Sequence, residues 1–119
     1  MIIQYFLTIQ SQLKIFHFQT TSYAQHKALG KAYDEIEELM DTFIEVFAGG
    51  DRSILDFDKI TMNCQGINSI SPITFMNNLT TYINGPLADA IPPNRGDLEN
   101  IRAEILGVVN RTLYLLNLK

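Results

Sequence analysis

The sequence predicts an all-α fold, an antiparallel four-helix bundle with one long crossover connection. Apolar residues recur at helical spacing in four segments, and hydroxyl, proline or glycine residues stand at the ends of these segments. Residues 51–70, between the second and third segments, are rich in Asp, Asn, Gly and Ser and keep no helical period. Because 119 residues suffice for one core but not for two, we expect residues 1–119 to form a single helical domain.

The first helix is expected over residues 2–19. Its outer face is polar but uncharged, since Lys14 is the only charged residue between Met1 and His26. Such a face meets another subunit or lies in a membrane interface, and we favour the subunit because interfacial helices normally carry several Lys and Arg residues. The polar residues also interrupt the apolar run that a secretory signal needs. The apolar stripe is Ile2, Phe6, Ile9, Leu13 and Phe16, and the residues opposite it are Gln4, Thr8 and Ser11, with Gln12 at the edge.

The second helix is expected over residues 22–48. A run of hydroxyl residues that ends at Ser22 offers N-caps, and Gly49-Gly50 is a pair suited to a C-cap. Six of the thirteen acidic residues lie within residues 34–45, so this helix is far more charged than the first. Its apolar stripe is Tyr23, His26, Leu29, Tyr33, Ile36, Met40, Phe43, Ile44 and Phe47.

The third and fourth helices are expected over residues 72–84 and 97–117. Ser71 supplies an N-cap that is followed by proline at the first helical position. Asn-Gly-Pro at residues 84–86 interrupts the pattern, so the third helix is expected to be short or kinked. Asp97 is the expected N-cap of the last helix. Two helices, a long connection and two more helices are the arrangement found among ferritin-like bundles.

Composition and charge narrow the classes of function. Nine basic against thirteen acidic residues give a net charge of −4 and a pI near 5.0, which argues against binding of nucleic acid or of an anionic membrane. No segment approaches the roughly 20 apolar residues of a transmembrane helix. The lone Cys64 has no partner for a disulfide within the chain, so we expect a reducing, cytoplasmic location.

The side chains with metal-binding chemistry lie in the first two helices. His17 and His26 project from or beside an apolar face. On the second helix, Glu37, Asp41 and Glu45 lie about 20°, 60° and 100° round from the second histidine. Asp41 is fifteen residues beyond His26, or about 22 Å along one helix, so the two residues have no means of sharing a metal ion within one chain. A two-fold axis that sets this helix antiparallel to its copy would bring the histidines to the partner's acidic residues.

A resemblance is carried by residues 13–50, which read LKIFHFQTTSYAQHKALGKAYDEIEELMDTFIEVFAGG. This stretch resembles the first helical pair of the Dps-like branch of ferritin-like proteins. In that family a His and an aromatic residue end the first helix, a second His opens the next, and an Asp-x-x-x-Glu pair follows fifteen and nineteen residues later. The resemblance implies a ferroxidase site between two-fold partners, with iron or another divalent metal bound by His17, His26, Asp41 and Glu45. It also implies a homodimer or a larger homo-oligomer.

The chain departs from that family at Gly30, where the family carries a further carboxylate. Glu37 is then the residue that would supply one. The basic DNA-binding tail of the family is also missing. The whole chain is similar to a small family of uncharacterised phage and viral proteins, which share Ser-Tyr-Ala-x-His-Lys-Ala-Leu-Gly, here residues 22–30. This second similarity implies a viral protein in the host cell cytoplasm and no particular activity.

Two hypotheses of different classes follow. In the first, a ferritin-like protein binds Fe(II), Mn(II) or Zn(II) between subunits, and a redox role would consume peroxide or dioxygen. In the second, a non-catalytic phage or viral helical oligomer binds a host protein or a small nucleotide-like ligand, or has a structural role. Metal binding alone is expected ahead of enzymatic turnover.

Overall fold

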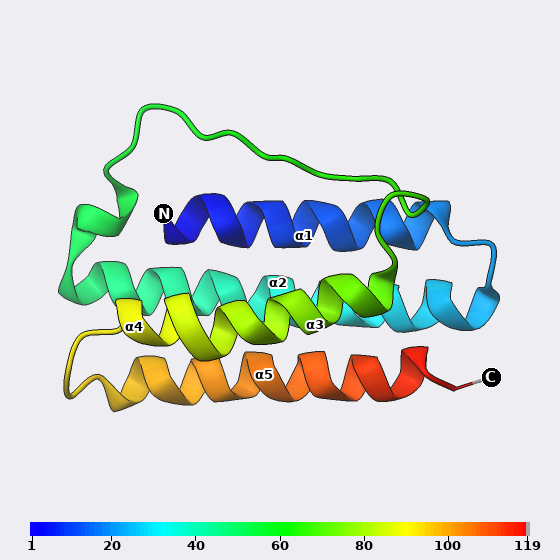
Figure 1. The fold of residues 1–119 in the computed structure, drawn as a ribbon. Coiled ribbons are helices and arrows are strands. Elements are labelled where there is room, and N and C mark those ends of the chain that lie inside the picture. The colour runs from blue at the N-terminus through cyan, green and yellow to red at the C-terminus, as the bar shows by residue number, and fades with distance from the viewer. Residues whose placement is uncertain (119) are drawn as a thin grey trace.

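The computed structural model describes residues 1–118, and none of these residues lies in a β-strand. Four helices of eleven residues or more form the molecule (Figure 1), which confirms the predicted all-α class. They are α1 (Ile2–Gln19), α2 (Tyr23–Gly50), α3 (Pro72–Tyr82) and α5 (Gly96–Leu116). A 3-10 turn at Arg52–Leu55 follows α2, and a π turn at Ile83–Leu87 joins α3 to the short α4 (Ala88–Ala90).

One connection crosses the whole length of the bundle. Helices α1 and α2 are antiparallel neighbours, and residues 56–70 then run back along α1 to the opposite end (Figure 1). Helix α3 therefore points in the same direction as α2, while α5 is antiparallel to both. Helix α2 packs most extensively against α1 and α5, and α3 packs mainly against α5. The expected long crossover is thus present.

The core lies along the apolar stripes that the helical periods predict, except that Tyr23, expected in the stripe of α2, is 75% exposed. Phe6 of α1 meets Phe43 of α2 edge to face, with ring centroids 5.4 Å apart. Phe16 meets Phe75 of α3 in the same way at 5.6 Å, and such aromatic pairs add about 1 kcal/mol each to the effect of burial. The largest fully buried side chains are Phe6, Phe16, Phe43, Leu13, Leu29, Ile36, Met40, Met76, Ile83, Leu87, Leu98 and Ile105.

Two helix starts have the expected caps, and α2 ends two residues beyond its expected end. The hydroxyls of Ser22 and Ser71 accept the N–H groups three residues on, as N-caps do. Helix α2 includes both glycines, ends at Gly50 and has Asp51 as its C-cap. A Cβ at Gly50 would lie 2.9 Å from a guanidinium nitrogen of Arg95, so the glycine makes room for that side chain.

Arg95 also explains why Asp97 is not the cap of α5. Its guanidinium donates to both carboxylate oxygens of Asp97 at 3.0 and 3.1 Å and to the carbonyl of Val46 at 3.2 Å. Asp97 therefore lies in the first turn of α5, which begins at Gly96. The hydrogen bond from Arg95 is the main reason why the pKa of Asp97 is lowered. Together these contacts join the start of α5 to the end of α2.

The third helix is kinked rather than ended at the Asn-Gly-Pro sequence. A π turn that contains Pro86 carries the chain on to Ala90. Proline lacks the N–H that a regular turn would use, so the local hydrogen-bond pattern has to change. Arg102 of α5 donates to the carbonyl of Ile83 at 3.3 Å and is oriented by Glu99. A side chain from another helix thereby satisfies a carbonyl of this irregular turn.

The uncharged outer face of α1 is covered by the crossing connection. Gln12 donates to the carbonyl of Gln65 at 2.7 Å and accepts from the N–H of the same residue at 2.8 Å. A glutamine amide both donates and accepts, so one side chain satisfies both backbone groups of an extended residue. Gln12 is almost fully buried by this contact, at 3% exposed.

Two more glutamines of α1 act in the same way. Gln4 accepts from the N–H of Thr61 at 3.1 Å, and Gln19 accepts from the N–H of Ile67 at 2.7 Å. The expectation that this face meets another subunit is therefore wrong, because the chain's own connection lies on it. The face is uncharged because amides, rather than charges, match the backbone groups that it binds.

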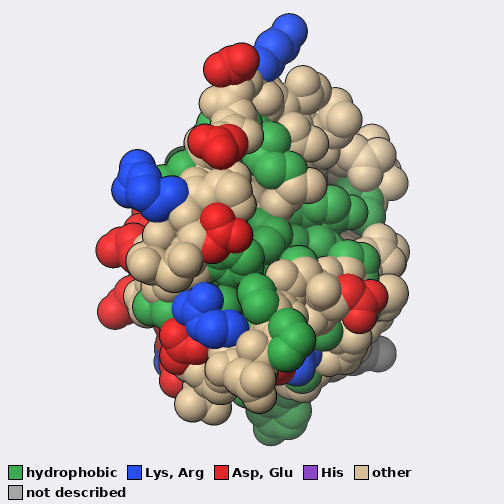
Figure 2. Space-filling model, turned by 90° about the vertical axis from the view of Figure 1, so that its left-hand side faces the viewer, with side chains coloured by type: hydrophobic (Ala, Val, Ile, Leu, Met, Phe, Trp, Pro, Cys, Tyr) green, Lys and Arg blue, Asp and Glu red, His purple; other side chains and the backbone are tan. Residues whose placement is uncertain are grey.

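Surface features of the bundle agree with the mixed composition. Figure 2 views the end at which α2 finishes and α5 begins, and shows hydrophobic side chains in the centre with acidic and basic side chains around them. This end therefore presents no patch of purely positive or purely negative charge. Within residues 1–118, no helix is both long enough and apolar enough to cross a membrane.

Candidate functional site

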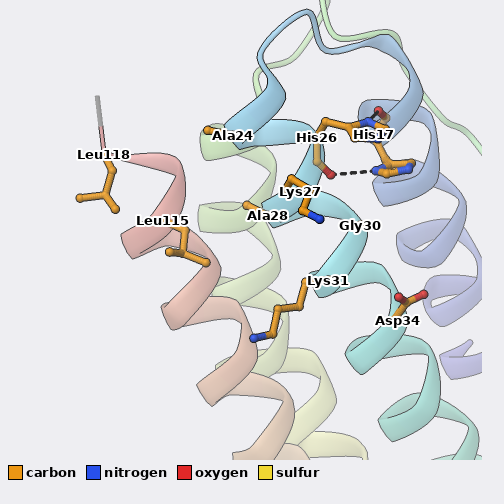
Figure 3. Close-up of a pocket in the computed structure, with 10 residues that line it drawn as sticks. All are labelled: His17, Ala24, His26, Lys27, Ala28, Gly30, Lys31, Asp34, Leu115 and Leu118. Atoms are coloured by element: carbon orange, nitrogen blue, oxygen red, sulfur yellow. Dashed lines mark hydrogen bonds between the residues drawn. The ribbon is translucent and has the colours of Figure 1, made fainter.

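The two histidines form a closed pair at the turn between α1 and α2. Nδ1 of His17 lies 2.9 Å from the carbonyl of His26, and Nδ1 of His26 lies 2.8 Å from the carbonyl of His17. The two rings stack with centroids 3.8 Å apart and planes 18° apart. Figure 3 shows the hydrogen bond from the ring of His17 across to α2. Contacts of this kind tie the last turn of α1 to the first turn of α2.

The hydrogen bonds determine which ring nitrogen carries the proton. A carbonyl oxygen only accepts, so both Nδ1 atoms have to donate. In a neutral imidazole the other nitrogen then has no proton, and Nε2 presents a lone pair. His17 and His26 are both only partly exposed, so the pair lies at the surface of the bundle rather than in its core. Each neutral ring therefore keeps one Nε2 acceptor that these hydrogen bonds do not use.

Gly30 makes this arrangement possible. A Cβ at that position would lie 2.9 Å from Cε1 and 3.0 Å from Nδ1 of His17, closer than real contacts allow. The ring of His17 therefore lies directly against the backbone of α2. From the sequence, Gly30 stands only where a carboxylate is missing, but in the structure the ring of His17 fills that space. A signal was available, since glycine inside a helix costs about 1 kcal/mol relative to alanine and needs a structural reason.

The predicted acidic residues lie elsewhere on α2. Asp41 and Glu45 are exposed, fifteen and nineteen residues beyond His26 in a continuous helix. That separation corresponds to about 22 and 28 Å along the axis. Within residues 1–118, no three His, Cys, Asp or Glu side chains are grouped closely enough to hold a metal ion. The structure thus brings the histidines together and keeps both acids away from them within one chain.

Glu37 has different neighbours from the other predicted ligands. It is half-buried near Tyr33, where burial and then the negative charge of Glu37 raise the pKa of the tyrosine hydroxyl. The ammonium of Lys14 lies 4.5 Å from the ring centroid of Tyr33 and 5.5 Å from that of Phe18. The single charged residue of α1 is therefore held by cation–π contacts next to the histidine pair.

A shallow concavity of about 630 Å³ lies on the outer side of α2, next to the histidines. Figure 3 shows His17 and His26 on one side of α2 and Leu115 and Leu118 of α5 on the other. Lys27 and Lys31 lie on the helix surface between these groups, among small side chains. The leucines come from about ninety residues further along the chain, so local sequence patterns did not reveal this surface.

Fold and site together define an all-α bundle with a paired-histidine corner. The chain belongs to DUF5856, a family of unknown function, which it matches over residues 17–116. The match begins at His17 and takes in all of α2, α3 and α5. It confirms the expected similarity to an uncharacterised family. No curated protein and no solved structure matches the chain.

Proposed function

We propose that this protein is a ferritin-like, Dps-resembling bundle that binds Fe(II) or another divalent metal ion at a two-fold interface between two copies. The observation that carries the proposal is the pair of Nδ1–H to carbonyl hydrogen bonds of His17 and His26. Metal-binding histidines almost always donate their other ring N–H to a carbonyl, carboxylate or water, which orients the ring. Both histidines have this second contact.

The donor set suits a borderline divalent cation. Two neutral imidazoles come from one chain, and carboxylates come from Asp41 and Glu45 of the partner subunit, with Glu37 as a further candidate. Imidazole and carboxylate ligands suit Fe(II), Mn(II) and Zn(II). Bound iron would supply redox chemistry with peroxide or dioxygen. The residues of this chain hold the imidazole rings in place through Nδ1, so that Nε2 is the ring nitrogen left for a metal ion.

The helix arrangement supports the ferritin-like part of the proposal. A helical pair, one end-to-end crossing and a second pair are present in this order, as in ferritin-like bundles. Gly30 does not weaken the proposal, because the ring of His17 fills the space in which the resembling family carries a carboxylate. A reducing cytoplasm, that of the host cell if the protein is viral, remains part of this proposal because Cys64 is a free thiol.

Metal content tests the proposal directly. The protein is loaded with Fe(II) or Zn(II), desalted and measured by elemental analysis and native mass spectrometry. Stoichiometric metal is expected in the wild-type chain, and Asp41→Asn with Glu45→Gln should remove it because both changes delete carboxylate ligands. The native mass spectra also show whether this variant is still a dimer. Glu104→Gln, an exposed change on α5, is the matched control and should keep the metal. Wild-type protein without stoichiometric metal would refute the proposal.

A second candidate function is a non-catalytic helical oligomer that binds a host protein or a small nucleotide-like ligand, or that has a structural role. The concavity beside Lys27 and Lys31 favours it, since two ammonium groups next to apolar side chains fit an anionic group with an apolar body. Adenosine monophosphate serves as the probe. Binding that is lost in Lys27→Ala with Lys31→Ala supports this candidate, and equal weak binding by both proteins contradicts it.

A further inference from the structure

The outer face of α2 carries an ordered stripe of charge. Its members are exposed and recur every three or four residues, so they share one face of the helix. Two lysines come first and four acids follow, towards the end of the helix. The stripe consists of Lys27, Lys31, Asp34, Glu38, Asp41 and Glu45.

Contacts within the chain do not account for this order. Among the described residues, Lys31 forms an ion pair only with Glu35, at 4.0 Å, and Glu35 is paired more closely with Arg111 of α5. Lys27 lies 5.9 Å from the ring of Tyr23, and neither lysine meets an acid of the stripe. The helix dipole favours acids towards the N-terminus and bases towards the C-terminus, which is the reverse of the order found. The stripe is therefore better explained by a partner than by the stability of α2.

The stripe is complementary to its own copy. Lys27 and Lys31 are four residues apart, and so are Asp41 and Glu45. If two copies of α2 lie antiparallel about a two-fold axis that crosses their outer faces at the level of residue 36, position 27 of one copy meets position 45 of the other. Position 31 then meets position 41. A two-fold axis makes every such contact twice, so four pairs of opposite charge form at once. We infer that a second copy of this chain docks antiparallel on the outer face of α2.

The shape of this face fits the same occupant. Ala24 is small and exposed, and the surface around Lys27 and Lys31 is concave, so another helix can approach closely. The outer face of α1 is not available, because the crossing connection covers it. The inference rests on the proposed function in one respect, because this second copy is the partner that the metal site needs. The charge pattern itself does not depend on a metal ion.

The middle of the stripe contains a repulsive contact, which provides a further test of this arrangement. An axis near Ile36 also brings Asp34 of each copy near Glu38 of the partner subunit, and these like charges repel. Neutralising them with Asp34→Asn and Glu38→Gln should therefore tighten the dimer. A surface that merely keeps the chain soluble gives no reason for such a change.

Charge reversal tests the inference in metal-free buffer that contains a chelator. Wild-type protein is expected to be dimeric by native mass spectrometry and light scattering. Lys27→Glu with Lys31→Glu, and separately Asp41→Lys with Glu45→Lys, should each weaken dimerisation by about a hundredfold or more, because attraction becomes repulsion at four pairs. Mixing the two variants should restore a one-to-one heterodimer, and combining all four changes in one chain should restore the homodimer.

Matched controls change the same net charge elsewhere. Arg52→Glu with Lys59→Glu, and Asp56→Lys with Asp58→Lys, alter exposed residues that follow α2 and should leave the dimer unchanged. Circular dichroism checks that every variant keeps its helical content. A monomeric wild-type chain, or reversed variants that dimerise like the wild type, would overturn the inference. A charge-dependent dimer without metal would retain this inference while refuting the proposed function. Metal bound by a dimer that Lys27→Glu with Lys31→Glu does not weaken would overturn the docking inference alone, and metal bound by a monomer would overturn both.

Discussion

The outer faces of α1 and α2 are neighbours in the same hairpin but have opposite chemistry. The face of α1 carries glutamine, serine and threonine, and residues 56–70 lie across it. The face of α2 carries ordered charges and remains uncovered within the chain. The difference shows that an uncharged polar face can be an intramolecular contact, in which amides satisfy backbone groups. Exposed charges with a regular order indicate a surface for solvent or for another molecule.

The largest effect is expected from disrupting the covered face. Gln12→Glu removes the donor to the carbonyl of Gln65 and sets a carboxylate against that oxygen in a nearly buried site. The free energy of unfolding should fall by about 2 kcal/mol, as measured by urea denaturation. Asn110→Asp, an exposed amide-to-carboxylate change on α5, should have little effect.

Cys64 provides a second measurement of the same change. Cys64 is in the crossing connection, and its thiol lies near the carbonyl of Thr8 in α1. Burial raises the pKa of this thiol. Because the thiolate is the reactive form, alkylation of the native protein at mildly alkaline pH should be slower than that of a free thiol. Gln12→Glu should accelerate it by loosening the connection. Equal rates in both proteins would mean that Gln12 does not hold this segment in place.

An intermediate effect is expected at the junction of the two faces. Gly30→Ala places a methyl group against the ring of His17 and should break the reciprocal hydrogen bonds of the histidine pair. The gain in helix propensity, about 1 kcal/mol, offsets part of the steric cost, so a net loss of about 1 kcal/mol is expected. Nuclear magnetic resonance of the Nδ1 protons reports the loss of the bonds. Gly49→Ala in the same helix, where a Cβ meets nothing within 4 Å, should instead stabilise the protein.

The smallest effect on folding is expected on the uncovered face. Lys27→Ala and Glu38→Ala remove exposed charges that form no ion pair in the described part of the chain. Each should change the free energy of unfolding by less than about 0.5 kcal/mol. The measurement belongs at high ionic strength, where attraction between copies is screened. A larger loss at either position would assign that residue a structural role in the single chain.

Much of the fold was predictable because helices and their starts depend on local sequence. Apolar spacing identified all four helices, and Ser22 and Ser71 identified two caps. The kink at residues 84–86 was one of the two expected outcomes, whereas the contacts of Arg95 at Gly50 and of Arg102 at Ile83 come from residues distant in sequence and were not predicted. For the candidate site, the sequence identified both histidines but not their reciprocal bonds. The role of Gly30 depends on the path of another helix, which no local pattern contains.

The crossing connection has a consequence for the order of folding. The histidine contacts close a loop of only nine residues, so the α1–α2 hairpin can form early. The hydrogen bonds from α1 to the connection join residues that are separated by 48 to 57 positions in the sequence. They form only after the chain has returned along the whole bundle. During synthesis the outer face of α1 therefore stays exposed to solvent until residues 61–67 have left the ribosome. Hydrogen exchange should find the same contacts to be the first that open.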